Sequence, residues 1–421
     1  MRDRGMNRKM LARGAIVLVL GGALLWLVSV VTVAQVRART DPAGALAVWG
    51  WNSEALGGGA IASIQADPEG VDTTRVRALA VRALQRDPTS VTAAATLGIL
   101  AAMADDDARA VGAFTYAQSL SRRDPTTNLW MIEHAVQAGD VRSALANYDR
   151  AMLTSRSLRP LLTTTLAQAT SDPAVFAELA PMVRRRPLWW ADYVSAFITS
   201  SPTPARTFPR MFALLALNPQ VPREREWLKA AMHRLIDEKA YATAAAFYRA
   251  TVPGSVGLLR NGSFEAANDF PPFDWQFTDT PELLARQEAA SGAGGGAALL
   301  VEVQRDRGGL AAQQLLTLAP GQYRLTGHVG APDAIAVANA RLALRCYRSP
   351  GELASITLPT PRDAGANFGL SFRVGPNDCA VQTLDLLVSE SGSPRDAALW
   401  LDDLHLEPLS NSVGASARPP S

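Results

Sequence analysis

Cysteine and histidine, two residue types that often catalyse reactions and bind metals, are scarce in this 421-residue chain. It has two cysteines and four histidines, and it lacks the His-Glu-x-x-His, Gly-x-Ser-x-Gly and Walker motifs. The glycine-rich run at 292–297 precedes a strand-like segment instead of opening a helix, so it does not fit a dinucleotide-binding loop. The histidines are scattered at His134, His233, His328 and His405. We therefore expect no enzymatic activity.

The two cysteines, Cys346 and Cys379, have no Cys-x-x-Cys spacing and no nearby histidine that would indicate a metal site. If they lie outside the cytoplasm, their oxidising surroundings favour a disulfide between them. Closing a loop of roughly 33 residues would stabilise the fold by about 3–4 kcal/mol, if the effect is entropic. Two free buried thiols and a metal pair are the alternatives.

The N-terminal region determines the compartment of the cysteines. Residues 14–34 carry no charge, and 21 such residues are enough to span a bilayer as a helix. Residues 1–13 hold five basic residues and one acidic residue, whereas only Arg37 and Arg39 follow the apolar run closely. The positive-inside rule thus predicts a cytoplasmic basic tail over 1–13, a transmembrane helix over 14–34 and a periplasmic remainder, in a bacterial inner membrane. A cleaved signal peptide is the alternative, although its apolar part would usually be shorter.

The composition excludes two classes of protein. Hydrophobic residues make up 48% of the chain and charged residues 19%, whereas a disordered chain needs low hydrophobicity and high net charge. The formal net charge is +2, and the basic excess lies in 1–13, so the rest of the chain is slightly acidic. Nucleic-acid-binding proteins usually carry a basic patch, so we expect no nucleic-acid partner.

The stretch 41–255 is rich in Ala, Leu and Arg and is predicted to be helical. Asp-Pro pairs divide it, because proline disfavours helix at the residue before it and suits the first turn of the next helix. Pro88 and Pro125 are 37 residues apart, close to the period of two-helix repeats. Further prolines make the second half irregular, so a generic helical array is the alternative. Trp189 and Trp190 are expected in the core, although they could instead anchor a partner.

The segment between Pro88 and Pro125 resembles a tetratricopeptide repeat. A Leu-Gly pair and an Ala-x3-Phe-x2-Ala pattern stand where that family has them, at Leu97-Gly98 and at Ala110, Phe114 and Ala117. A second copy lies at Ala144, Tyr148 and Ala151, and a weaker one at Thr243, Phe247 and Ala250. The resemblance implies an α-helical solenoid of stacked helix pairs that binds a protein partner.

Near residue 253 the helix periodicity gives way to glycine, proline and alternating apolar residues. Apolar runs bounded by turn residues predict strands at Ala297–Val303, Gln314–Leu318, Gln322–Val329, Arg341–Tyr347, Phe368–Val374, Gln382–Val388 and Ala398–Leu406. Their spacing predicts an antiparallel β-sandwich over 256–408, followed by a disordered tail over 409–421. The predicted fold class is therefore multidomain α plus β.

Three motifs in the predicted sandwich resemble the jelly-roll carbohydrate-binding modules of the galactose-binding-like superfamily. They follow the family's order along the chain: Asn261-Gly-Ser-Phe-Glu265 with Pro272-Phe-Asp-Trp275, then Leu318-Ala-Pro-Gly-Gln-Tyr-Arg-Leu-Thr-Gly327, then Trp400-Leu-Asp-Asp-Leu-His-Leu406. The resemblance implies a structural calcium between the first and last strands, held by Glu265 and by Asp402 or Asp403. Backbone carbonyls would complete the ligand set, because calcium takes about 6–8 oxygens. Ordinary strand-end polar residues are the alternative.

The same resemblance implies that aromatic rings contact a glycan. Phe273, Trp275 and Tyr347 are the candidates, whereas the family motifs also favour a structural role for Trp275 and Trp400. Together these features predict a non-enzymatic envelope scaffold with a protein-binding array and a glycan-binding sandwich, in surface polysaccharide assembly or export. An enzyme acting on envelope glycans and a purely structural periplasmic spacer are the alternatives. Apart from calcium, we expect no cofactor.

Overall fold

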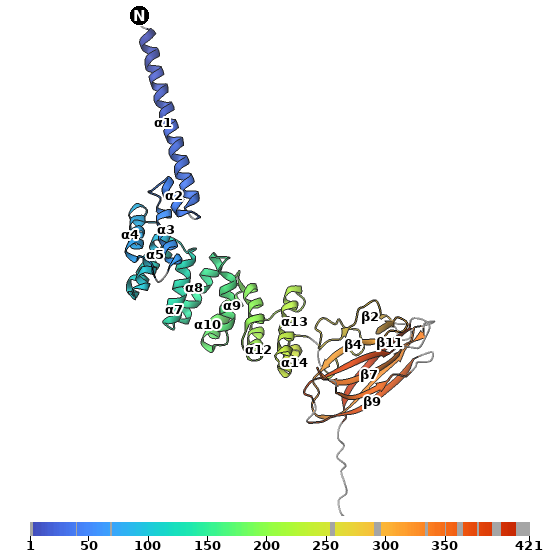
Figure 1. Ribbon diagram of the computed structural model, residues 1–421. Helices are drawn as coiled ribbons and strands as arrows, with labels where there is room; N and C mark the ends of the chain where they lie inside the picture. The colour runs from blue at the N-terminus through green and yellow to red at the C-terminus, as the bar shows by residue number, and fades with distance from the viewer. Residues whose placement is uncertain are drawn as a thin grey trace, which may run out of the picture. The chain divides into compact units, whose positions relative to one another are not determined.

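The computed structural model (Figure 1) describes residues 3–38, 40–67, 70–252, 257–289, 296–332, 336–349, 351–359, 365–376, 379–389 and 397–409. Side chains before residue 20 and those of residues 336 and 337 lie outside this description. The side chains of the predicted basic tail are therefore outside this description. Residues 410–421 of the predicted disordered tail also lie outside it. The chain divides into two compact units, Met1–Ser201 and Pro202–Ser421.

The described part of the first unit is helical. Its helices are α1 (Asp3–Arg37), α2 (Pro42–Val48), α3 (Ser53–Ala66), α4 (Thr73–Arg86), α5 (Val91–Met103), α6 (Asp107–Leu120), α7 (Pro125–Gln137), α8 (Val141–Thr154), α9 (Arg159–Ala169), α10 (Pro173–Arg184) and α11 (Trp190–Ser200). Asp-Pro pairs begin three of them, because Asp41, Asp124 and Asp172 each accept a hydrogen bond from a backbone N–H of the first turn. Asp87 instead ends α4.

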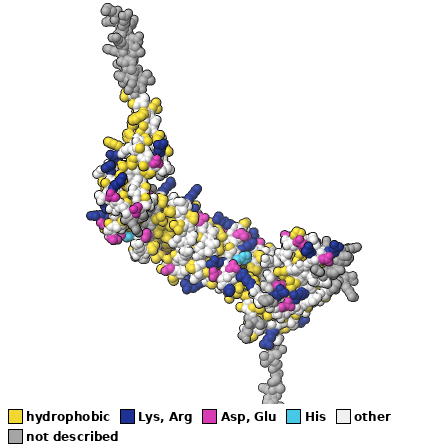
Figure 2. Space-filling model, viewed as in Figure 1, with side chains coloured by type: hydrophobic (Ala, Val, Ile, Leu, Met, Phe, Trp, Pro, Cys, Tyr) yellow, Lys and Arg dark blue, Asp and Glu magenta, His cyan; other side chains and the backbone are white. Residues whose placement is uncertain are grey.

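Helix α1 presents apolar side chains to its surroundings over its described part (Figure 2). The window Leu20–Arg37 has a mean hydropathy of 1.6, and Leu25, Trp26 and Val36 are each about two-thirds or more exposed, at 70%, 66% and 72%. Among the described residues this helix alone is long and apolar enough to cross a membrane, a description that a signal sequence near the N-terminus also meets. The predicted span 14–34 lies inside α1.

Successive helices of the first unit pack as pairs, α5 with α6 and α7 with α8 among them. Phe114 of α6 is fully buried and stacks on Trp130 of α7, with 4.3 Å between the ring centroids. Gly98 of α5 lies against the same ring, where a Cβ would come within 2.7 Å of it. The small residue therefore admits the aromatic ring that joins one helix pair to the next, as the sequence pattern requires.

The second unit begins with α12 (Pro204–Leu215), α13 (Pro222–Asp237) and α14 (Tyr241–Thr251). Its strands are β1 (Gln276–Phe277), β2 (Leu283–Ala289), β3 (Ala297–Val303), β4 (Gly309–Leu316), β5 (Gly321–Gly330), β6 (Ala336–Val337), β7 (Asn339–Cys346), β8 (Glu352–Thr357), β9 (Ala366–Val374), β10 (Gln382–Ser389) and β11 (Ala397–Pro408). They form two sheets, and the described strand pairs are antiparallel apart from β6 with β11. We call the sheet ordered β1-β4-β10-β7-β8 sheet A, and that ordered β2-β3-β11-β5-β9 sheet B.

The two sheets form a sandwich around one apolar core. Leu299 of sheet B and Leu342 and Leu386 of sheet A are fully buried in it, so both sheets contribute side chains to this core. The disulfide between Cys346 and Cys379 is present and connects the end of β7 to the segment before β10, with 5.5 Å between the two Cα atoms.

The last helix is packed onto the sandwich. The Tyr248 ring of α14 stacks on Phe273 at 5.0 Å, and its hydroxyl donates a hydrogen bond to the buried carboxylate of Asp274. Asp237 of α13 pairs with Arg348 at 3.1 Å. These contacts place α13 and α14 in one compact unit with the sandwich.

Candidate functional sites

Of the three carboxylates of the predicted calcium site, Asp402 is buried, whereas Glu265 and Asp403 are exposed. Asp402 and Asp403 occupy an irregularity in β11, where Asp403 has a positive φ of 51°, and Asp402 is 8% exposed. Asp402 Oδ1 accepts the Asp403 N–H at 2.7 Å, and Glu265 Oε1 accepts the Ala297 N–H at 2.7 Å. Burial raises the pKa of Asp402, and the negative charges of Asp403 and Glu265 raise it further.

This arrangement satisfies only part of what calcium needs. In the part of the chain that the structure describes, no group of three or more His, Cys, Asp and Glu side chains is placed to hold a metal ion. Calcium binding here would therefore depend on backbone carbonyls for most of its roughly 6–8 oxygen ligands. The structure has one buried carboxylate here, Asp402, whose charged form is disfavoured by burial and by the charges of Asp403 and Glu265, and a cation would relieve that repulsion. The calcium stays a prediction.

The raised pKa of Asp402 gives a testable pH dependence. Between its unfolded and folded pKa values the native state holds a proton that the unfolded state has lost, so stability falls as pH rises through that interval. Without calcium we expect Asp402→Asn to raise the melting temperature at pH 7 and to leave it unchanged below about pH 3, where Asp is protonated in both states. Differential scanning fluorimetry with a chelator measures this effect.

Asp306→Asn, at an exposed carboxylate elsewhere in the sandwich, is the control and should shift melting little. Adding calcium should raise the melting temperature of the wild type and not that of Asp402→Asn. Melting of the wild type that is the same with calcium and with chelator would contradict the calcium prediction. An Asp402→Asn variant that melts lower at pH 7 in chelator would contradict the charge repulsion.

Two of the three predicted glycan contacts have buried side chains. Phe273 and Trp275 are 5% and 1% exposed, because Phe273 packs against Tyr248 and Trp275 belongs to the sandwich core. The Trp275 Nε1–H donates to the Asn261 carbonyl at 3.2 Å, so its polar atom is also occupied. Buried rings offer no face to a sugar. Tyr347, which follows β7, is half-buried, and its ring packs edge-on against Tyr241 of α14.

A row of polar side chains crosses the outer face of sheet A. Its members are on four adjacent strands, which are β4, β10, β7 and β8: Gln313, Asp385, Arg341, Arg345 and Glu352. Gln313 Nε2 donates to Asp385 Oδ1 at 2.9 Å, and Arg345 lies 3.9 Å from Asp385 and 3.8 Å from Glu352. Arg341 closes the row with an ion pair to Glu352 at 2.8 Å. We call this set the sheet A polar row.

The sheet A polar row is both fixed and accessible. The side chains of Arg341, Arg345 and Glu352 are 39%, 35% and 30% exposed, whereas Asp385 is 5% exposed beneath them. A hydrogen bond from Ser355, together with Arg341, holds the pKa of Glu352 below its ordinary value. Because guanidinium and carboxylate groups have several donors and acceptors, each can hold its neighbour and still bond a ligand hydroxyl.

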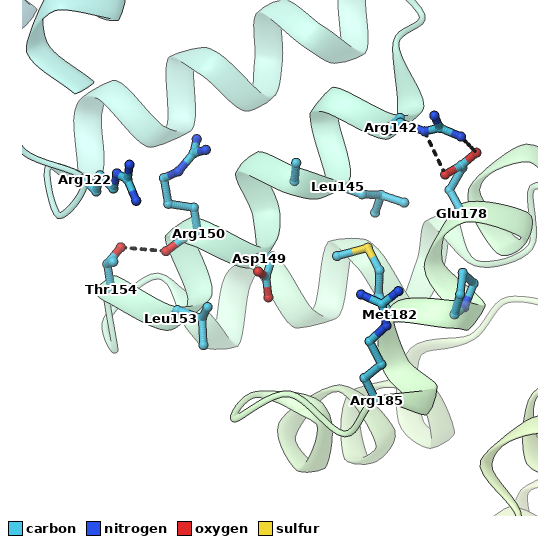
Figure 3. Close-up of a pocket in the computed structure, with 12 residues that line it drawn as sticks. Arg122, Arg142, Leu145, Asp149, Arg150, Leu153, Thr154, Glu178, Met182 and Arg185 are labelled. Carbon is cyan, nitrogen blue, oxygen red and sulfur yellow. Dashed lines mark hydrogen bonds and ion pairs between the residues drawn. The ribbon is translucent and has the colours of Figure 1, made fainter. Parts of the chain in front are cut away.

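A second site lies in the helical array. A groove of about 630 Å³ is lined by residues of α8, α10 and the segment before α7 (Figure 3). Its apolar part is formed by Leu145, Ala146, Leu153, Pro181 and Met182. Its arginine-rich part is formed by Arg122, Arg142, Arg150 and Arg185. We call it the arginine groove. Sequence reasoning missed it, although the α8 residues recur at 142, 145, 146, 149, 150 and 153, a spacing that places them on one helix face.

The comparisons with known proteins bear on the sandwich. No family model matches the chain, and no curated protein matches it. Among solved structures, TmCBM61 in complex with β-1,4-galactotriose is 19% identical, with 36% of this chain and 99% of that chain covered and a TM-score of 0.27. A CBM4 structure is 15% identical, and the match covers 36% of this chain and 99% of that chain with a TM-score of 0.28. A Stig cyclase from Fischerella sp. TAU is 18% identical, with 36% and 97% covered and a TM-score of 0.28. The carbohydrate-binding-module matches cover the C-terminal β region.

Proposed function

We propose that this protein is a non-enzymatic, membrane-anchored scaffold of the bacterial envelope. Its helix α1 stays in the inner membrane, its periplasmic array of tetratricopeptide type binds a protein, and its sandwich binds a glycan. Assembly or export of a surface polysaccharide would use such a combination. The observation that carries the proposal is the way α1 joins the array.

The C-terminal end of α1 belongs to the core of the first unit. Ala34 and Ala38 are 0% and 1% exposed, and Ala38 clusters with Ala45 of α2 and Ala55 of α3. A hydrogen bond of 3.2 Å from the Asn52 amide to Gln35 Oε1 adds a polar contact. Cleavage after Ala34, as in a signal peptide, would remove Ala34 from this core and would leave Gln35 and Ala38 at a new N-terminus without the helical turns that precede them. The packing therefore supports an anchor that is retained.

Glycan binding is supported by the sheet A polar row. Sugars present hydroxyl groups that both donate and accept, and recognition needs several polar groups held in fixed positions on a surface. Arg341, Arg345 and Glu352 are such groups, since they are about one-third exposed, and Arg341 and Glu352 hold each other in an ion pair. The half-buried Tyr347 lies two residues beyond Arg345 in the chain, and it is the one predicted aromatic contact that keeps some exposure.

We expect Arg345→Ala to weaken glycan binding by about tenfold or more, because it removes a charged donor and leaves Asp385 without that partner. A glycan array probed with the full-length protein in detergent measures this effect, with β-1,4-galactooligosaccharides and acidic and neutral polysaccharides among the ligands. Arg324→Ala, at an exposed arginine of sheet B, is the matched control and should bind as the wild type does. Absence of binding to any glycan, or equal binding by both variants, would count against the proposal.

A further inference from the structure

We infer that the arginine groove binds an acidic segment of a partner protein. This inference rests on the proposed role of the array in protein binding, and it adds the site and the chemistry of the partner. The groove lies in the first unit, between α8 and α10, and is independent of the sandwich.

The two acidic residues of the groove each accept hydrogen bonds from other side chains of the array. Glu178 of α10 accepts two hydrogen bonds from the Arg142 guanidinium, at 3.1 and 3.3 Å, which connect α10 to the start of α8. Asp149 accepts a hydrogen bond of 2.7 Å from Nε1 of Trp189, a side chain that is fully buried. The Arg142–Glu178 pair and the Asp149–Trp189 hydrogen bond therefore hold the walls of the groove in place, and the four arginines of the groove outnumber its two carboxylates.

Three guanidinium groups are left with no carboxylate partner among the described residues. Arg150 is hydrogen-bonded to the neutral Asn147 amide at 2.6 Å, and Arg122 and Arg185 have no side-chain partner in the described part of the chain. Their positive charges face one open volume, where they repel one another and attract an anionic ligand. Arginine in particular binds carboxylates through two parallel hydrogen bonds.

The apolar part of the groove indicates what carries those carboxylates. Leu153 is 43% exposed and Met182 is half-buried, so a ligand can bury apolar groups against both. A polypeptide offers acidic and apolar side chains a few ångströms apart, whereas an acidic polysaccharide offers carboxylates without aliphatic side chains. Charge complementarity and the apolar part of the groove together thus favour a protein segment with Asp or Glu next to Leu, Ile, Val or Met.

Selection from a phage-displayed library of random dodecapeptides tests the inference with the full-length protein in detergent. We expect the enriched peptides to be rich in Asp and Glu beside apolar residues. The double variant Arg122→Glu/Arg185→Glu should bind them about tenfold or more weakly by fluorescence anisotropy. Both arginines are exposed, so this variant should fold normally. Arg77→Glu/Arg82→Glu, at exposed arginines of α4, makes the same change of charge outside the groove and should bind as the wild type does.

Four results would overturn the inference. Acidic peptides that bind the groove variant as well as the wild type would mean that the array binds protein elsewhere, which keeps the proposed function and removes this site. Enrichment of neutral or basic peptides would contradict the inference that the partner segment is acidic. Failure to enrich any peptide would contradict both the peptide site in the groove and the proposed binding of a protein by the array. If polygalacturonate displaces the peptides from the groove and binds it more tightly than the peptides do, the site is assigned to a glycan.

Discussion

Replacing Asp274 with alanine is expected to lower the stability of the second unit by about 3–5 kcal/mol. Asp274 is 1% exposed and accepts hydrogen bonds from the Tyr248 hydroxyl and from the Phe270 N–H, and its carboxylate lies 3.5 Å from Arg260. Burial, and then the bond to Asp274, raise the pKa of Tyr248, so its hydroxyl stays protonated and donates. Alanine would leave the Tyr248 hydroxyl without its acceptor and Arg260 without this carboxylate. Hydrogen exchange followed by mass spectrometry measures the change in α14 and in the sandwich separately.

The controls separate this network from general effects of charge. Tyr248→Phe removes one hydrogen bond to a charged group and should cost about 1.5–3 kcal/mol. Asp237→Ala breaks an exposed ion pair with Arg348 and should cost at most about 1 kcal/mol. In Asp274→Ala, exchange should rise in α14 and in the sandwich together. Faster exchange confined to α14 would show that the helix is not part of one cooperative unit with the sandwich.

Replacing Phe114 with alanine is expected to destabilise the first unit by about 3–5 kcal/mol. The ring is fully buried between α5 and α7, stacks on Trp130 and fills the space that Gly98 leaves open. Its loss would create a cavity between two helix pairs, which support each other only through such contacts. Urea unfolding of the full-length protein in detergent, followed by hydrogen exchange in α5 to α8, measures the effect.

A second substitution tests the same contact from the opposite side. Gly98→Ala adds a methyl group within 2.7 Å of the Phe114 ring and should cost about 1–3 kcal/mol through overpacking. In combination with Phe114→Leu, the cost of Gly98→Ala should become smaller, because a smaller neighbour leaves room for the methyl group. Strict additivity of the two substitutions would contradict the proposed packing of Gly98 on Phe114.

The sequence predicts the long, alternating strands well and the short or helix-like ones poorly. The predicted strand Ala297–Val303 coincides with β3, and the other six predicted strands each overlap an observed one. Strand β2, by contrast, reads Leu-Leu-Ala-Arg-Gln-Glu-Ala, a composition that favours helix. It is a strand because seven of its residues pair with β3, so tertiary pairing overrides its local preference.

The candidate sites were harder to predict for a physical reason. Phe273 and Trp275 have the right residue types for sugar contact, but the sequence does not reveal that Tyr248 and the sandwich core cover them. The sheet A polar row and the arginine groove are assembled from residues far apart in the chain, Gln313 with Asp385 being one example. Only strand register and helix packing bring such residues together.

Co-flotation of cell-surface polysaccharide with liposomes tests most directly whether one chain joins a membrane to a glycan. Full-length protein is reconstituted through α1, and fluorescently labelled polysaccharide from the source cells is added before centrifugation in a density gradient. We predict that polysaccharide floats with liposomes that carry the wild type, and that Arg345→Ala liposomes float without it. Wild-type protein that floats while the polysaccharide stays at the bottom, or protein that does not enter the liposomes, would contradict the proposed function.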